Sequence, residues 1–365
     1  MKNTFGNNLS ISLFGESHGA YIGAMLDGLA PGTKINNEYI NKKLLFRKPI
    51  GKISTKRQEK DEYKIISGVK NNIATGSPIC IIIPNEDIKS NDYNELSEIS
   101  RPGHADYSAY KKYYGFNDYV GGGHFSGRLT TPIVALGAIV QLALEEQNIF
   151  IGTHILQCAN IKDAKFKNYK EDIKVLNEKA FATLDDNKAK LMKEEIIKAS
   201  NDKDSVGGIL ETSIIGVPSG VGEPWFDSIE SVLSHALFSI PGVKGVEYGA
   251  GFNISKLRGS KANDSLYVKN NIVKSKTNNN GGINGGISNG SPILFRCAIK
   301  PTPSIAKEQD TINFKNNKNV KIVIRGRHDP AIVHRARVVV DALSAIVIYD
   351  LLLARGGIEY MRKIK

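Results

Sequence analysis

The longest apolar run of the chain lies near its C-terminus, at residues 330–353, and reads PAIVHRARVVVDALSAIVIYDLLL. Its most apolar part, residues 336–354, carries Asp341 and Asp350. Charged side chains are costly inside a bilayer, so the run predicts a long helix buried in a folded domain and not a membrane span. Proline is favoured at the first position of a helix and aspartate as the cap before it, so Asp329 is the expected N-cap.

Further helices and strands are predicted on the N-terminal side of this run. The expected helices are residues 37–46, 131–146, 186–200 and 227–238, and the expected strands are residues 10–14, 78–84, 208–217 and 292–300. Strands and helices do not alternate regularly, which disfavours a doubly wound parallel sheet and favours an α+β class. Gly- and Asn-rich segments at residues 15–32, 115–128 and 278–290 are expected to be loops, where binding chemistry often concentrates.

The composition is typical of a globular protein, with 365 residues and a formal net charge of +12. The charge has two readings: lysines spread over a solvated surface, or cations lining a site for an anionic ligand. Nucleic acid binding is disfavoured because the chain has no run of five Lys or Arg residues and no known nucleic-acid motif. Three cysteines with no CxxC spacing predict neither a zinc site nor a disulfide framework, as in a reducing cytoplasm.

Two short motifs combine a histidine with glycine and a carboxylate. The first, GESHG at residues 15–19, offers His18 as a proton donor near neutral pH, or else is a capped turn with a surface histidine. The second is RPGHAD at residues 101–106. It presents a cation, an imidazole and a carboxylate on one turn, which suits an anion with a proton-transfer partner. Its alternative reading is a local ion pair between Arg101 and Asp106.

Three further motifs point to anion binding. GGGHFSGR, residues 121–128, precedes a predicted helix, where exposed backbone N–H groups favour a phosphate or carboxylate. KPTPS at residues 300–304 is a stiff turn with donor side chains, and RGRHDP at residues 325–330 has more charge than a helix cap needs. After the first predicted helix come Arg47, Lys52, Lys56 and Arg57, which either close over a polyanion or lie in a solvated loop.

The order of these segments resembles the chorismate synthase family. The motifs are GESHG, TKRQEKD, TGSPI, RPGHADY, DYVGGGHFSGR, GEPWFD, GVKGVEYG, GGINGGISNG, KPTPSI and GRHDP, and they span residues 5–353. The resemblance implies an anti-1,4-elimination of phosphate from 5-enolpyruvylshikimate 3-phosphate to give chorismate, which is the last common step of aromatic amino acid biosynthesis. It also implies a need for reduced FMN, although the reaction has no net redox change.

The resemblance also implies site residues. His18 would donate a proton near the departing phosphate, His104 would stabilise the reduced flavin ring, and Asp329 would take part with the flavin in removing the C6 proton. The substrate-binding cations would be Arg47, Lys52, Arg57, Arg101, Arg128 and Arg327. The flavin site would comprise His124, Phe125, Ser126, Pro241, Gly242, Gly285, Lys300, Pro301, Thr302, Pro303, Ser304 and Arg327. Lys52 replaces an arginine common in the family, and His124-Phe125 replaces a frequent Arg-Ser.

At the level of the whole chain, the resemblance implies one catalytic domain, residues 1–365, with a β-α-β sandwich of helices between antiparallel sheets. It implies a cytoplasmic homotetramer, with NADPH or a separate flavin reductase as the source of reducing equivalents, and with neither nucleic acid nor membrane as a partner. The alternative enzyme is a flavin-dependent oxidoreductase, which would consume one reductant per turnover. The alternative outside catalysis is a polyanion- or RNA-binding protein with steep salt dependence.

Overall fold

The structure, a computed structural model, describes residues 2–55, 57, 59–86, 97–324, 326 and 328–361. Two five-stranded sheets form its framework, and every strand pair in them is antiparallel. The first sheet has the order β1 (Thr4–Phe5), β2 (Ser10–Gly15), β3 (Tyr21–Asp27), β7 (Ile79–Pro84) and β4 (Lys64–Ser67). The second has the order β11 (Val243–Tyr248), β16 (Ile293–Ile299), β10 (Gly208–Ile215), β8 (Phe150–Cys158) and β9 (Ile161–Lys162). The expected α+β class is confirmed.

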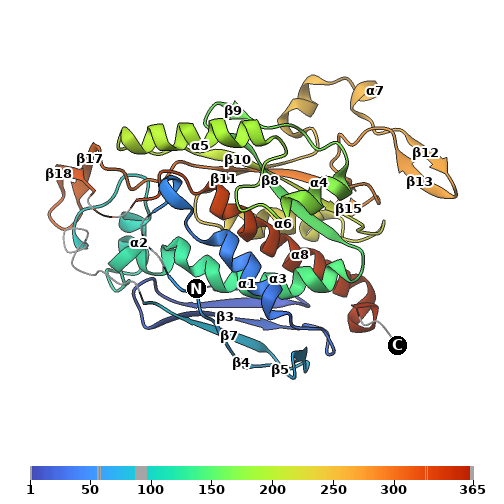
Figure 1. Cartoon of the computed structure of the whole chain (residues 1–365), viewed down its shortest axis with the longest axis horizontal. Coiled ribbons are helices and arrows are strands. Elements are labelled where there is room, and N and C mark those ends of the chain that lie inside the picture. The colour runs from blue at the N-terminus through green and yellow to red at the C-terminus, as the bar shows by residue number, and fades with distance from the viewer. Residues whose placement is uncertain are drawn as a thin grey trace.

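Helices lie between the two sheets (Figure 1). They are α1 (Asn37–Arg47), α3 (Thr130–Glu145), α6 (Ile229–Phe238) and α8 (Val333–Met361). Helix α3 packs on β3 and β7 of the first sheet, and α8 packs on α3 and on β8 and β10 of the second. Two amphipathic helices, α4 (Tyr169–Leu176) and α5 (Asp186–Asn201), pack against the second sheet, and α5 lies on the side away from α8 (Figure 1).

The remaining elements are short. They comprise the helix α2 (Asp106–Lys112), the single turn α7 (Gly259–Ala262) and four two-stranded hairpins. The hairpins are β5 (Val69–Lys70) with β6 (Ile73–Ala74), β12 (Leu266–Lys269) with β13 (Ile272–Ser275), β14 (Ile283–Asn284) with β15 (Ile287–Ser288), and β17 (Glu308–Asn313) with β18 (Lys318–Val323). The β12–β13 hairpin projects from the body of the molecule (Figure 1).

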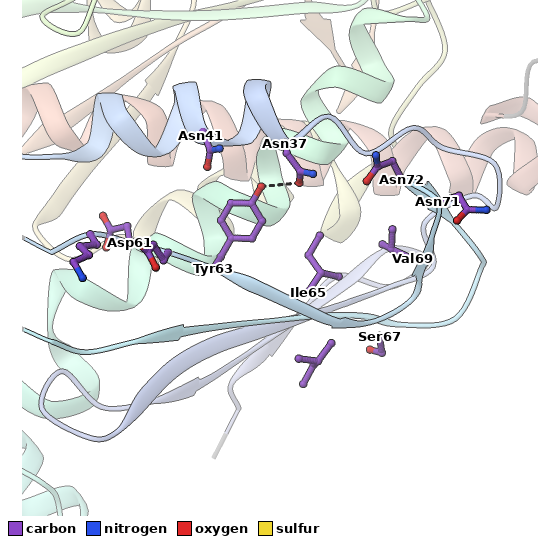
Figure 2. A pocket seen from close by; sticks show the side chains of 12 residues that line it. Asn37, Asn41, Asp61, Tyr63, Ile65, Ser67, Val69, Asn71 and Asn72 are labelled. Atoms are coloured by element: carbon purple, nitrogen blue, oxygen red, sulfur yellow. Dashed lines mark hydrogen bonds between the residues drawn. The ribbon is translucent and has the colours of Figure 1, made fainter.

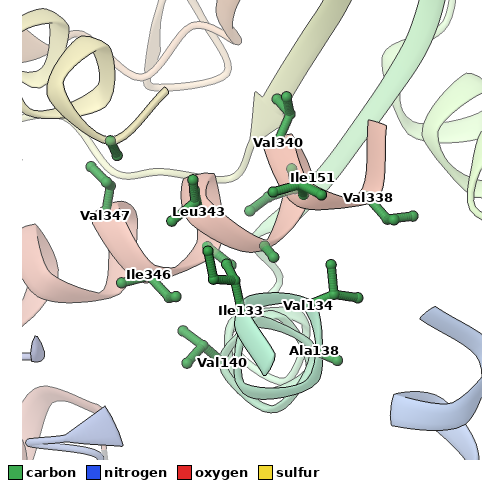
Figure 3. Close-up of a cluster of buried hydrophobic side chains, with 14 of the residues drawn as sticks. Ile133, Val134, Ala138, Val140, Ile151, Val338, Val340, Leu343, Ile346 and Val347 are labelled. Atoms are coloured by element: carbon green, nitrogen blue, oxygen red, sulfur yellow. The ribbon is translucent and has the colours of Figure 1, made fainter. Parts of the chain in front are cut away.

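The core is densest where α3 meets α8. Figure 3 shows apolar side chains of both helices, among them Ile133 and Leu343, gathered at this contact. The helices approach closely because Gly137 faces Ala342, and a Cβ on Gly137 would overlap the Ala342 side chain. The segment Gly127–Glu145 is long and apolar enough to cross a membrane, but 83% of it is buried inside this core.

The two aspartates of the long apolar run are buried and hydrogen-bonded. The Asp350 carboxylate accepts the backbone N–H groups of Asn7, Asn8 and Leu9 at 3.1, 2.6 and 2.9 Å. The Asp341 carboxylate accepts the Thr153 hydroxyl at 2.6 Å. A buried charge is tolerated when such partners replace water, so both groups fit the core helix that the sequence predicts.

Several predicted boundaries need correction. Helix α8 begins at Val333 and not at Pro330, so Asp329 is not its cap; the carboxylate instead accepts a hydrogen bond from the Thr55 N–H at 2.8 Å. The predicted loop 15–32 contains strand β3, whose Gly23 leaves room for the Phe14 ring of the neighbouring strand. Glycine in a strand interior obscures the β pattern, which explains the error.

We expect Gly137→Ala to lower the free energy of unfolding by about 1–3 kcal/mol, because the added methyl group overpacks the contact with Ala342. The same change at an open helix position would stabilise the helix by up to about 1 kcal/mol. Gly259→Ala is the control, since nothing lies within 4 Å of the new methyl group. Urea unfolding measures both, and a Gly137→Ala variant as stable as the parent would contradict the close approach.

Candidate active site

One cavity of about 930 Å³ collects most of the predicted site residues. The glycine-rich loop before α3, the turn at residues 101–105, the loop after α1, the 300–304 turn and the start of α8 all contribute to its walls. Small-molecule sites usually have volumes of about 300–1,000 Å³, so this cavity is large enough for a cofactor and a substrate together. Among the described residues, its lining includes the cations Lys2, Arg47, Arg57, Arg101, Arg128, Lys244, Lys300 and Arg335, and only three carboxylates, Glu59, Asp61 and Asp329.

The glycine-rich loop separates two of the predicted catalytic histidines. Gly121 and Gly122 have φ values of +61° and +85°, a conformation that glycine adopts without steric cost. A Cβ on Gly121 would overlap the His18 ring, and one on Gly122 would lie 3.4 Å from the His104 ring. The two glycines therefore let both imidazoles approach the same stretch of backbone from different directions.

His104 is oriented by a carboxylate behind it. Its Nδ1 lies 2.6 Å from Asp106 Oδ1, and Arg101 donates to the same carboxylate at 2.7 and 2.8 Å. Burial alone would raise the pKa of Asp106, but the hydrogen bonds from Arg101 and His104 hold it well below its usual range. Nδ1 also lies 3.0 Å from Arg101 Nη2, so both hydrogen-bond partners of the ring among the described residues are on its Nδ1 side, and Nε2 is the ring nitrogen left for the cavity.

Arg128 is a structural cation. Its guanidinium forms an ion pair with Asp61 and donates to Asn85 Oδ1 at 3.0 Å, to Thr131 at 3.3 Å and to the Pro84 carbonyl at 3.1 Å. Its donors are thus largely taken by the protein. Arg128 lines the cavity as predicted, but its contacts fit a residue that supports the site better than one that grips a ligand.

Arg47 is buried and less completely bound. Its guanidinium lies 3.8 Å from Asp61 and 3.5 Å from the Thr130 hydroxyl, and its Nε has no hydrogen-bond partner among the described residues. Burial lowers the pKa of this guanidinium, whereas the Asp61 carboxylate opposes the shift. An incompletely satisfied buried cation on a cavity wall is a position where an anion would be stabilised.

Arg57 and the segment around it lie at the cavity edge. The guanidinium donates to Glu59 at 2.7 Å and to Ser17 Oγ at 3.2 Å, so it joins the loop after α1 to the first histidine motif. Burial would raise the pKa of Glu59, but the hydrogen bond from Arg57 and its other cationic neighbours lower it. Arg57 therefore contributes positive charge close to His18.

Asp329 joins three segments at the cavity wall. Its Oδ1 accepts the Thr55 N–H, and its Oδ2 accepts Arg335 Nη1 at 2.6 Å. Arg335 also donates from Nε to the Arg47 carbonyl at 2.9 Å. The carboxylate is thereby fixed in one orientation between the loop after α1 and the first turn of α8.

Ten of the predicted flavin residues line the same cavity. These are His124, Phe125, Ser126, Pro241, Gly242, Lys300, Pro301, Thr302, Pro303 and Ser304. The Oγ1 atom of Thr302 is buried without a hydrogen-bond partner among the described residues, as expected where a ligand supplies one. Lys300 is fixed by the Gly103 carbonyl, and burial together with nearby Lys244 lowers its pKa.

Some predicted residues do not line this cavity. Lys52 lies in an exposed 3-10 turn at Gly51–Ile53, which contacts α5. Gly285 lies between β14 and β15, away from the cavity walls. His18 is not itself a lining residue but lies directly behind Gly121, which is. The remaining predicted residue, Arg327, lies outside the described part of the chain, as do Lys56 and Arg325, so its roles stay predictions.

Sequence reasoning missed Arg335 and Asn85 as parts of the site. Arg335 follows the recognised GRHDP motif by a few residues, inside a run that otherwise predicts a core helix. Asn85 directly follows strand β7 and donates to the carbonyls of Glu16 and Gly19 at 3.0 and 2.7 Å, which fixes the turn that carries His18. A charged residue in an apolar helix was the only available signal for Arg335, and Asn85 had none.

A second cavity, of about 780 Å³, lies between α1 and β4 (Figure 2). Its walls carry amide, hydroxyl, charged and aliphatic side chains, and the Tyr63 hydroxyl donates to Asn37 Oδ1 at 2.8 Å across it. None of the predicted catalytic or ligand-binding residues lines this cavity. The chemistry of the chain is therefore assigned to the larger cavity.

Cations around an open cavity, with two imidazoles and a carboxylate beside them, define an enzyme that acts on an anionic small molecule. A profile of the chorismate synthase family matches residues 9–353. The chain therefore belongs to the chorismate synthase family, whose members are lyases that remove phosphate from 5-enolpyruvylshikimate 3-phosphate.

Individual relatives agree with this assignment. A chorismate synthase of Thermococcus kodakarensis is 42% identical over 356 residues, covering 98% of this chain and 99% of the relative. One of Lachnoclostridium phytofermentans is 45% identical over 366 residues, covering 99% and 98%. A crystal structure of a chorismate synthase superposes with a TM-score of 0.77 at 28% identity, covering 98% of this chain and 96% of that one.

We expect Gly121→Ala to reduce activity by about 100-fold, because the methyl group displaces the His18 ring from its place behind the loop. Gly51→Ala is the matched control: Gly51 also has a positive φ, of +46°, but nothing lies within 4 Å of its added methyl group. Steady-state kinetics and circular dichroism compare the two. Equal loss of activity in both variants would assign the effect to backbone strain and not to His18.

The stability of the protein in acid tests the burial of His334, in the first turn of α8. This residue is fully buried, its Nε2 lies 2.8 Å from Ser54 Oγ, and burial lowers its pKa to about 3. The unfolded value is about 6.5. The unfolded chain therefore binds the extra proton first, and the stability contribution is complete above pH 6.5 and lost as pH falls towards 3.

Below pH 6 we expect the unfolding free energy of the parent to lose up to about 1.4 kcal/mol per pH unit through this group. His334→Asn removes that component, so the difference between parent and variant should shrink from pH 7 to pH 5. Urea unfolding at several pH values measures it. Parallel stability curves for the two proteins would show that burial does not lower the pKa of His334.

Proposed function

We propose that the large cavity catalyses the elimination of phosphate from 5-enolpyruvylshikimate 3-phosphate. The C6–H bond breaks and its proton passes to a base, while the bond between C3 and the phosphate oxygen breaks and its electron pair leaves on phosphate. The ring gains one C=C bond, and the products are chorismate and inorganic phosphate. The observation that carries the proposal is that His104, Asp329 and several arginines line a single cavity, with His18 directly behind it.

The cations would hold the substrate, which carries one phosphate and two carboxylates. Arg47 is the first candidate because its buried Nε has no partner in the described part of the chain, and bidentate arginine suits each of the three anionic groups. Arg57 and Arg101 lie at the same cavity but are braced by Glu59 and Asp106. Bracing of this kind fixes the donors before the substrate arrives, so less ordering is needed on binding.

The two histidines and the aspartate would manage the protons. His18, next to Arg57 and Ser17, would donate to the departing phosphate. His104, held by Asp106, would present Nε2 to the flavin side of the cavity. Asp329 would accept the C6 proton, and its two fixed oxygens limit the directions from which that proton can arrive.

The cavity also fits the flavin that the family requires. Reduced FMN, when bound, supplies electron density to the substrate as the C–O bond breaks and recovers it afterwards. His124, Phe125, Ser126, the turn at Pro241 and Gly242, and residues 300–304 would hold it, with Thr302 Oγ1 as an available hydrogen-bond donor and acceptor. The Nδ1 of His124 lies 3.0 Å from the Gly15 carbonyl, which keeps this ring beside the strand that leads to His18.

The proposal extends to the whole protein. Residues 1–365 would form one catalytic domain whose layers correspond to the β-α-β sandwich of the family. It would act as a cytoplasmic homotetramer, with NADPH or a separate reductase supplying reduced flavin, and without nucleic acid or membrane partners. Membership of the chorismate synthase family favours this function over the flavin-dependent oxidoreductase considered from the sequence.

The test is an anaerobic assay with 5-enolpyruvylshikimate 3-phosphate and chemically reduced FMN, in which chorismate and free phosphate are followed together. Equal release of both products, with the flavin still reduced at the end, is expected for the elimination. Consumption of one equivalent of reduced flavin per turnover would support the oxidoreductase instead. Absence of chorismate despite FMN binding would contradict the proposal.

We expect His104→Ala to lower kcat by about 100- to 1,000-fold with the fold retained, since a positioned acid–base group contributes on that scale. Asp106→Asn should give a smaller loss, because the ring stays but loses the carboxylate that orients it. Lys111→Ala, an exposed change on the neighbouring helix α2, serves as the control. Turnover at the parent rate in His104→Ala would remove this residue from the mechanism.

A further inference from the structure

We propose that Arg335 is a positioning residue that aims the Asp329 carboxylate at the reacting hydrogen, an inference that rests on the proposed role of Asp329. Arg335 touches the carboxylate and a neighbouring backbone carbonyl, and it acts through them. Its contribution would therefore appear in turnover and not in substrate binding.

The geometry gives Arg335 two anchors. Its Nη1 donates to Asp329 Oδ2 at 2.6 Å, and its Nε donates to the Arg47 carbonyl at 2.9 Å. The planar guanidinium fixes the angle between these two donors. Arg335 thereby fixes the Asp329 oxygens relative to the C-terminal end of α1, where Arg47, the arginine best placed to bind a substrate anion, is the last residue.

The second oxygen of Asp329 is fixed independently. Its Oδ1 accepts the Thr55 N–H at 2.8 Å. An ionised carboxylate has about four lone-pair sites, so one donor on each oxygen, counted over the described residues, leaves one site on each for the reaction. With Arg335 removed, Asp329 could rotate about the single remaining hydrogen bond, and its free lone pairs would no longer have one direction.

The place of Arg335 in its helix argues against a role in helix stability. It lies in the first turn of α8, which begins at Val333. The positive end of the helix dipole disfavours a cation there, and most of the helix that follows is buried and apolar. A cation at the positive end of a helix lowers helix stability, and such unfavourable placements are expected at functional sites.

The experiment compares Arg335→Gln and Arg335→Lys with the parent, using substrate carrying hydrogen or deuterium at C6. For Arg335→Gln we expect kcat to fall by about 100-fold, KM to stay within about threefold, and the deuterium isotope effect on kcat to rise because proton removal becomes slower. Arg335→Lys should recover part of kcat, since lysine supplies a single donor. Arg355→Gln, elsewhere on α8 and bound within the described chain to the Ser219 carbonyl, should match the parent.

A double-mutant cycle with Asp329→Asn separates the possible outcomes. If Arg335 acts through Asp329, adding Arg335→Gln to Asp329→Asn should cost no further activity. The same 100-fold loss in both backgrounds would overturn the inference while leaving Asp329 in the mechanism, and so would a raised KM with kcat and the isotope effect unchanged. Parent activity in Asp329→Asn alone would instead refute the proposed function of Asp329.

Circular dichroism and FMN binding establish that each variant is folded before its kinetics are interpreted. Arg335→Lys keeps the charge and most of the side-chain volume, so it provides the test if Arg335→Gln does not fold. In that case a kcat lowered with unchanged KM, and a raised isotope effect, would support the inference. Parent values of kcat, KM and the isotope effect in every Arg335 variant that folds would overturn it.

Discussion

The contact of α3 with α8 sets the position of everything in the site. Gly137 lets the two helices approach until their side chains interlock, and both helices begin at the same cavity, α3 just after Arg128 and α8 just after Asp329. Their N-terminal ends therefore face one volume, where the aligned peptide dipoles favour anions. A shift of one helix against the other would move the glycine-rich loop relative to Asp329, so packing in the core controls geometry in the site.

The cavity is cationic, yet most of its arginines are partnered by acidic side chains of the same chain. Asp61 lies between Arg128 and Arg47, Glu59 binds Arg57, and Asp106 binds Arg101. Buried charges need such partners to offset the loss of water. Arg128, whose donors are largely used, supports the wall, whereas Arg47 Nε has no partner among the described residues.

Much of this could be predicted from sequence because the informative signals are local. Glycine runs, a histidine beside glycine, and Asp-Pro each mark a particular backbone geometry, and most residues chosen on that basis line one cavity. The errors arose where the deciding factor was distant in sequence. The local pattern does not predict strand β3, because Gly23 makes room for the Phe14 ring and the Ile81 carbonyl of the two neighbouring strands. Asp329 carries the sequence signal of a cap, but its partners, Thr55 and Arg335, come from other places in the chain. Lys52 and Gly285 are predicted from their positions in motifs, and a position in a motif does not show whether the residue faces the cavity.

The Asp350 carboxylate has a consequence for biosynthesis. It satisfies three backbone N–H groups at residues 7–9, and 341 positions of sequence separate it from Leu9. A ribosome adds about 5–20 residues per second, so the turn that begins the first sheet waits for tens of seconds before its acceptor emerges. During that interval the N-terminal strands lack both the Asp350 hydrogen bonds and the apolar face of α8. The first sheet therefore gains these contacts only after α8 has been synthesised, and a product truncated before α8 would expose the apolar face of that sheet to chaperones and proteases.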